Sequence, residues 1–297
     1  MDLSRFESQI TKTGFVLEHK ILKQLKSDGW TSISNKYYID DAEESIREID
    51  LIAYKVGPVG SMKIYTVLVI SCKKSESNCW SFLSRNINIK DPNKNFMPLH
   101  IWSNNKPSLY QIEGEDFHEK YYAAAIKAGI KNVLPPEFDV FAFQEMDKNS
   151  GVPKNDKAIF SSITSVMKAQ SYELNALPKR KKEHCVFHFS LLNVIDADLI
   201  RIDFEHAAPK ASAINEITYI SNYIINKKED CSRIHFISEK SFAEILKDYN
   251  NLHIFNRGFL TRQYEDFFVD AIKIPKKYKV LEEDFLKLLS QNCELNG

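Results

Sequence analysis

The stretch from residue 47 to residue 75 constrains the fold most, because it holds two apolar runs of strand length joined by a short link rich in turn-forming residues. The link, residues 55–61, contains Gly57, Pro58 and Gly60, which disrupt regular structure and favour a turn. We therefore predict two neighbouring strands around a loop over residues 55–61. Helical patterns before and after this pair indicate a mixed α/β (α+β) fold.

Polar side chains gather at one end of this predicted strand pair. Because side chains alternate between the two faces of a strand, Glu48 and Asp50 share one face of the first strand, and Ser71 and Lys73 share one face of the second. The same alternation places Ile49, Leu51 and Ala53 on the opposite face. Charged groups rarely point into a half-buried surface without partners. Carboxylates and a lysine on adjacent strands therefore predict a site for a divalent cation and a phosphate.

A helical pattern precedes the strands. Residues 4–27 carry apolar side chains at helical spacing, and Gly14 predicts a break near residues 11–13. Glu18 borders the predicted buried stripe. The spacing leaves two interpretations open, a carboxylate in water at the edge of the stripe or a helix-borne acidic group directed at the strand site.

The spacing from Asp50 to the tripeptide Ser71-Cys72-Lys73 resembles the motif of the PD-(D/E)XK nuclease superfamily, which has the restriction-endonuclease-like fold. The resemblance covers roughly residues 11–82. It implies metal-dependent hydrolysis of DNA by in-line displacement that leaves a 5′-phosphate, in a restriction or anti-phage defence role. Further segments that look like bacterial members are residues 13–18, 28–30, 37–40 and 47–50.

The chain departs from the family at Ser71, where the motif usually has Asp or Glu. A hydroxyl is a weaker ligand for Mg²⁺ than a carboxylate, because hard cations favour charged oxygens. The resemblance implies that Asp50 is the main ligand for Mg²⁺ or Mn²⁺ and that Glu18 and Glu48 supply the missing carboxylate. Lys73 would orient and polarise the attacking water or stabilise the charged transition state. Glu76 is a weaker candidate, because it lies just beyond Lys73.

Ser71 also leaves a second function open, a nuclease-fold protein that has lost catalysis and binds nucleic acid or a partner protein. RNA stays open as a substrate, since the same residues would act on it. A homodimer is expected by analogy, because nucleases of this fold often need two copies to cut two strands.

Composition narrows the class of protein. Lys plus Arg equals Asp plus Glu at 40 each, which argues against a broadly basic surface but allows a local basic groove. The five cysteines form no C-x-x-C pair, which argues against a zinc site and favours reduced thiols in the cytoplasm. No apolar run approaches the roughly 18 residues of a membrane helix, and the first residues lack a secretory signal pattern.

The basic run at residues 179–182 is the best candidate boundary, between a nuclease-like core over residues 1–178 and an α+β part over residues 179–297 packed on the same core. Residues 83–118 are expected to be irregular. Predicted helices are residues 119–129, 155–176, 240–249 and 282–289. Predicted strands are residues 30–40, 138–143, 185–195, 199–204, 214–225 and 234–237, with a hairpin turn at residues 196–198 and another turn at residues 256–259.

Overall fold

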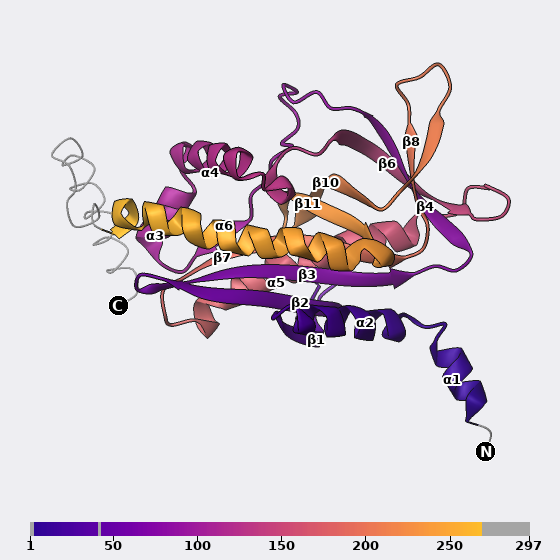
Figure 1. Cartoon of the computed structure of the whole chain (residues 1–297), viewed down its shortest axis with the longest axis horizontal. Helices are drawn as coiled ribbons and strands as arrows, with labels where there is room; N and C mark the ends of the chain where they lie inside the picture. Colours follow the sequence, from indigo (N-terminus) through magenta and orange to yellow (C-terminus); the bar gives the residue numbers. More distant parts are fainter. Residues whose placement is uncertain (1–2, 41–42, 269–297) are drawn as a thin grey trace.

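Two β-sheets form the centre of the molecule in the computed structural model, which describes residues 3–40 and 43–268 (Figure 1). The larger sheet has the order β1-β2-β3-β7-β11-β10, and a short strand, β5, pairs with β7. The smaller sheet has the order β6-β4-β8-β9. The predicted mixed α/β class is therefore confirmed. The strands are β1 (Thr31–Ile39), β2 (Ile46–Val59), β3 (Met62–Lys74), β4 (Asn78–Asn86), β5 (Ile101–Ser103), β6 (Phe138–Asp147), β7 (Cys185–Asp196), β8 (Leu199–Asp203), β9 (Lys210–Ile214), β10 (Glu216–Ile225) and β11 (Lys228–Ser238).

Helices cover both faces of the larger sheet (Figure 1). The helices α2 (Gly14–Ser27), α4 (Glu115–Ala128) and α6 (Phe242–Phe268) share a hydrophobic core with one face. The helix α5 (Lys157–Arg180) and strands of the smaller sheet share a second core with the other face. The remaining described helices are α1 (Ser4–Ile10), α3 (Lys106–Ile112) and the short helices η1 (Lys131–Val133) and η2 (Glu239–Ser241).

The predicted helix over residues 4–27 is confirmed together with its break. The helix α1 ends at Ile10, and α2 begins at Gly14. Leu17, Ile21 and Leu25 of α2 are buried, as their spacing predicts. The long helix predicted at residues 155–176 corresponds to α5, which continues for one further turn.

The predicted loop at residues 55–61 is wrong, because β2 continues to Val59 and only Gly60 and Ser61 form the turn. Gly60 has a φ of +55°, which a glycine adopts without strain. The pairing of β1 with β2 extends only to Tyr54, so Pro58 lies where that side of β2 is an edge and its missing N–H is tolerated.

The turn predicted at residues 256–259 is also wrong, because these residues lie inside the continuous helix α6. A glycine within a helix costs about 1 kcal/mol relative to alanine. Burying one large apolar side chain contributes about 1.5–3 kcal/mol, and Leu252, Phe255 and Phe259 are all buried in the first core. Burial therefore outweighs the local preference of Gly258 for a turn. The helix predicted at residues 282–289 lies outside the described residues.

The predicted hairpin between residues 185–195 and 199–204 is wrong. The strand β8 pairs with β4 and β9 in the smaller sheet, whereas β7 lies between β3 and β11 in the larger one. The segment at residues 196–198 therefore carries the chain from one sheet to the other. The hairpin that does form joins β10 to β11 through Asn226 and Lys227, whose φ angles are +51° and +62°. Two positive φ angles are typical of the turn that fits the twist of paired strands.

One further difference concerns the middle of the chain. Residues 83–118, predicted to be irregular, contain the end of β4, β5 and α3. The strand predicted at residues 214–225 corresponds to β10, and the short strand β9, which ends at Ile214, precedes it. Strands from both sides of residues 179–182 are hydrogen-bonded in both sheets, because β7 pairs with β3 and β8 pairs with β4.

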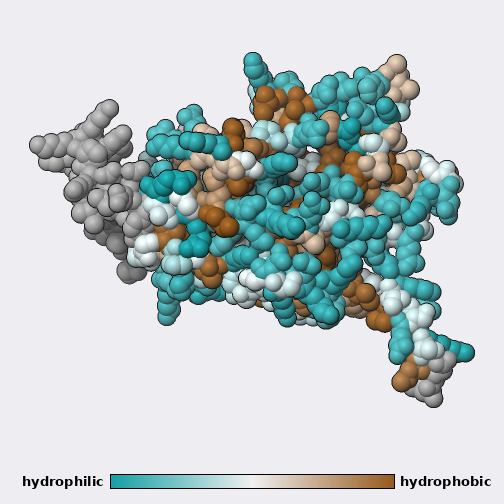
Figure 2. All heavy atoms as spheres, in the orientation of Figure 1, coloured by the Kyte–Doolittle hydropathy of each residue, from teal (hydrophilic) through white to brown (hydrophobic). Residues whose placement is uncertain are grey.

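The helix α1 projects from the body of the molecule (Figure 1). Its side chains are exposed, including Phe6 and Ile10, and Figure 2 shows hydrophobic atoms on and beside this helix against a largely hydrophilic face. Among the described helices, none combines the length and apolar character needed to span a lipid bilayer.

Candidate functional site

Three elements bring the candidate residues together at one end of the β2–β3 hairpin. The helix α2 packs on β1, β2 and β3 and carries Glu18 next to its buried stripe. The strand β2 carries Asp50, and the end of β3 carries Ser71 and Lys73. Glu18, Asp50 and Lys73 are partly exposed, whereas Ser71 is buried.

The Asp50 carboxylate is held by two hydrogen bonds and one longer ion pair from the end of β3. Its Oδ2 atom accepts a hydrogen bond of 2.6 Å from the backbone N–H of Cys72 and one of 3.1 Å from the Ser71 hydroxyl. The Lys73 Nζ lies 3.9 Å from the same oxygen. Hydrogen bonds to an ionised carboxylate are stronger than neutral ones, so this arrangement fixes the orientation of Asp50. The Asp50 side chain is 19% exposed, which leaves it accessible from solvent.

The local backbone differs from regular alternation at Asp50. The pairing between β1 and β2 runs to Ser34↔Leu51 and resumes at Lys36↔Ile49. Asn35, which lies between them, has a φ of +52°. Ile49 belongs to the second core, whereas Leu51 and Ala53 belong to the first. The prediction that these three share one face is therefore wrong, because the left-handed residue in β1 disturbs the pleat opposite Asp50.

Glu18 lies within the electrostatic influence of this group. Burial and the neighbouring Asp50 carboxylate raise the pKa of Glu18, whereas Lys73 opposes the increase. Burial and the same two carboxylates raise the pKa of the Cys72 thiol well above its usual range. A carboxylate whose ionisation is disfavoured by a neighbouring carboxylate is an arrangement that a cation would stabilise.

Ser71 is a buried residue that holds the Asp50 carboxylate through a hydrogen bond. The Ser71 side chain is 1% exposed and donates its hydroxyl hydrogen to Asp50. Asn193 of β7 lies beside Ser71 in the parallel pairing, is fully buried, and has no hydrogen-bond partner for either side-chain amide atom within the described residues. Sequence reasoning missed Asn193, although a lone amide in the otherwise apolar run of residues 191–195 was a usable signal. The contact from the Cys72 backbone has no signal in the sequence.

Two other acidic residues lie at the edge of this group. Glu48 is exposed and accepts a hydrogen bond from the Asn35 side chain, and it contributes least to the raised pKa of Glu18. Glu76 is exposed and forms an ion pair of 3.1 Å with Lys74. The structure thus brings together Glu18, Asp50, Ser71 and Lys73, with Glu48 at their margin.

The donor set is compatible with a hard divalent cation. The described residues contain no group of three or more His, Cys, Asp or Glu side chains that could enclose a metal ion. Mg²⁺ is commonly held by one or two carboxylates, with water and substrate phosphate completing its shell. Glu18 and Asp50 could provide those carboxylates.

The chain matches no protein-family model, no curated protein and no solved structure. A functional assignment therefore rests on the residues of the site and on their chemistry.

Proposed function

We propose that the protein is a metal-dependent nuclease that hydrolyses phosphodiester bonds of DNA. The observation that supports this proposal is the convergence of Glu18, Asp50 and Lys73 from α2, β2 and β3, with Ser71 bonded to Asp50. A pair of carboxylates beside a lysine offers oxygen ligands for a cation and a positive charge for a phosphate. The resemblance to the PD-(D/E)XK superfamily supports the same assignment.

Each residue has a separate role in this proposal. Asp50 and Glu18 hold Mg²⁺ or Mn²⁺, which supplies Lewis-acid activation of the scissile phosphate when bound. Lys73 orients the attacking water or stabilises the negative charge of the transition state. Ser71 and the Cys72 backbone keep the Asp50 carboxylate in position.

Cleavage of supercoiled plasmid and single-stranded DNA with Mg²⁺ or Mn²⁺ tests this proposal, with single-stranded RNA as a third substrate. We expect Lys73→Ala and Asp50→Asn to abolish metal-dependent cleavage without unfolding the protein. Lys63→Ala is a matched control, because Lys63 lies on the same strand about 33 Å away and forms an exposed ion pair with Glu183. If the Lys73→Ala variant cuts DNA as well as the wild-type protein does, the assignment is contradicted.

Ser71 supports a second candidate function, a protein that binds nucleic acid or a partner protein without cleaving. A serine replaces the carboxylate that the family motif usually provides, so one metal ligand is weaker. Fluorescence anisotropy with labelled DNA separates the two functions. Tight binding by the wild type, with no cleavage of any substrate under either metal, would favour this second function.

The biological setting is also a proposal. A restriction or anti-phage role, in a homodimer or with a partner protein, follows only from the family resemblance. The cysteines among the described residues are free thiols, which fits a reducing compartment such as the cytoplasm.

A further inference from the structure

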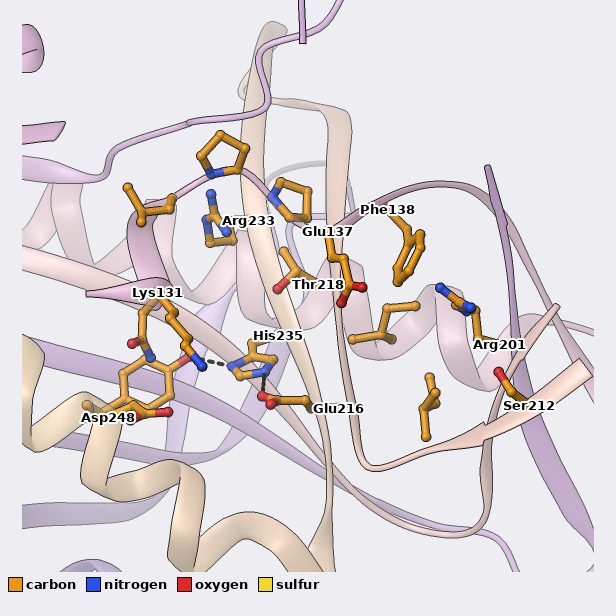
Figure 3. A pocket seen from close by; sticks show the side chains of 17 residues that line it. Lys131, Glu137, Phe138, Arg201, Ser212, Glu216, Thr218, Arg233, His235 and Asp248 are labelled. Atoms are coloured by element: carbon orange, nitrogen blue, oxygen red, sulfur yellow. Dashed lines mark hydrogen bonds and ion pairs between the residues drawn. The ribbon is translucent and has the colours of Figure 1, made fainter. Parts of the chain in front are cut away.

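A cavity of about 620 Å³ lies apart from the Asp50 site, between the two sheets and the start of α6 (Figure 3). Its wall includes residues from β8, β9, β10 and β11 and from the segment that joins η1 to β6. Glu18, Asp50 and Lys73 are not among the lining residues. The cavity is therefore a separate feature of the fold, and its size is within the range of small-molecule sites.

Arg233 of β11 places an uncompensated positive charge in this wall. One guanidinium nitrogen, Nη2, donates a hydrogen bond of 3.2 Å to the backbone oxygen of Phe96. The Nε atom is buried without a hydrogen-bond partner, and no carboxylate of the described residues forms an ion pair with this side chain. Burial lowers the pKa of Arg233 to about 10, so the group stays charged at neutral pH. A buried charge without a counter-charge is costly, and an anionic ligand would offset that cost.

Arg201 of β8 provides a second guanidinium group. Its central carbon lies 3.6 Å from the centre of the Phe138 ring, so the ring supports the flat face of the group. Its Nε and Nη1 atoms are buried and have no hydrogen-bond partner among the residues that the structure describes, and Nη2 lies 3.7 Å from a carboxylate oxygen of Asp203. Two N–H donor atoms of this guanidinium are therefore unused, and guanidinium groups are suited to binding phosphate oxygens.

The rest of the wall offers polar contacts for a larger molecule. Ser212 and Thr218 provide hydroxyl groups, and Lys131 adds a further positive charge at the end near α6 (Figure 3). Glu216 is engaged by His235 at 2.7 Å. Glu137 lines the cavity between the labelled arginines, where its carboxylate can accept hydrogen bonds from hydroxyl or amino groups.

We propose that this cavity binds a small phosphate-bearing molecule that also carries hydroxyl or amino groups, such as a nucleotide or a sugar phosphate. The phosphate contacts the guanidinium group of Arg201 at one side of the cavity, Arg233 adds positive charge at the other side, and the hydroxyl or amino groups face Glu137, Ser212 and Thr218. This site does not depend on the proposed nuclease activity, and its ligand would bind whether or not Asp50 supports catalysis.

Thermal unfolding in the presence of added ligands tests the site. The probes are inorganic phosphate, AMP, ribose 5-phosphate and succinate, each compared with sodium chloride at equal ionic strength. Because a ligand that binds only the folded state stabilises it, we expect saturating AMP or ribose 5-phosphate to raise the Tm by about 3 °C or more. Succinate distinguishes phosphate recognition from general binding of carboxylates.

Three variants give the test a clear outcome. Arg201→Gln should weaken binding at least about tenfold, because it removes the charged guanidinium group. Ser212→Trp should block the cavity from an exposed position on β9 with little effect on the core. Arg85→Gln is the matched control, since Arg85 lies over Phe141 and bonds to Asp139 but does not line the cavity.

Loss of the Tm shift in Arg201→Gln and Ser212→Trp, with retention in Arg85→Gln, would support the site. Absence of a shift with every phosphate probe would overturn the proposal. An equal shift in all variants, or a shift with succinate alone, would also overturn it.

Discussion

His253 makes the stability of this protein depend on pH in a direction that the structure determines. The side chain lies on α6, is 6% exposed, and its Nδ1 atom is 2.9 Å from the Thr66 hydroxyl of β3. Burial, together with repulsion by Arg257 and Lys55, lowers the pKa of His253 to about 4 from its ordinary value of 6.5. The buried ring is therefore neutral at pH values where an exposed histidine is protonated.

The direction of this pH dependence follows from proton binding in the folded and unfolded states. Between pH 6.5 and pH 4 the unfolded chain binds a proton at His253 that the folded protein does not bind. Stability rises with pH wherever the unfolded state binds more protons, so this contribution is present above pH 6.5 and is lost as the pH falls toward 4. A difference of 6.5 minus 4 is 2.5 pH units. At about 1.4 kcal/mol per unit, the full effect is about 3 kcal/mol, of which about 2 kcal/mol is lost by pH 4.5.

Urea unfolding followed by tryptophan fluorescence at pH 7.0, 6.0, 5.0 and 4.5 measures this loss. His253→Gln removes the titrating group. Between pH 7.0 and pH 4.5 we therefore expect the free energy of unfolding of this variant to fall by about 2 kcal/mol less than that of the wild type. His206→Gln is the control, because His206 is exposed in the loop between β8 and β9. His188, whose pKa is lowered to about 3 by burial, maintains some acid sensitivity in both variants.

Two outcomes would refute this reasoning. The first is a wild-type protein whose unfolding free energy is constant from pH 7.0 to pH 4.5. The second is a His253→Gln variant with the same pH dependence as the wild type, which would mean that His253 binds a proton equally well in the folded protein and in the unfolded chain.

Two further predictions concern bonds to carboxylates. Ser71→Ala removes the 3.1 Å hydrogen bond to Asp50 but leaves the bond from the Cys72 backbone. We therefore expect the free energy of unfolding in urea to fall by about 1 kcal/mol, and plasmid cleavage to decrease less than in Asp50→Asn. An equal loss of cleavage in the two variants would show that Ser71 acts directly. Burial would raise the pKa of Asp139, but bonds from Lys94 and Arg85 outweigh it and lower the pKa. Asp139→Asn should therefore destabilise the protein at pH 7 by about 1–3 kcal/mol. This effect should fade below pH 4, where acid protonates the wild-type carboxyl. A difference in unfolding free energy between variant and wild type that stays constant across pH would contradict this prediction.

The sequence by itself determined the elements whose patterns are local. The stripe of Leu17, Ile21 and Leu25 predicts α2, and its period of 3.6 residues also places Glu18 beside the buried face. Gly129 ends α4 with a φ of +68°, as the sequence predicts, because a glycine adopts that conformation without strain. Asp50 lies near the start of one apolar run and Lys73 near the end of the next, so their spacing predicts that both residues lie at the open end of the hairpin, away from its turn.

Only the tertiary structure decided features that depend on burial between distant segments. The helix α6 continues through Gly258 because its apolar neighbours fill the first core, whatever the local turn signals. The chain leaves one sheet for the other after β7 because β8 finds its partner in β4, more than 100 residues earlier. Asn193 lies beside Ser71, and Arg201 and Arg233 line one cavity, without any shared motif. Periodicity is a property of neighbouring residues, whereas the choice among possible partners is made by the packing of the whole chain.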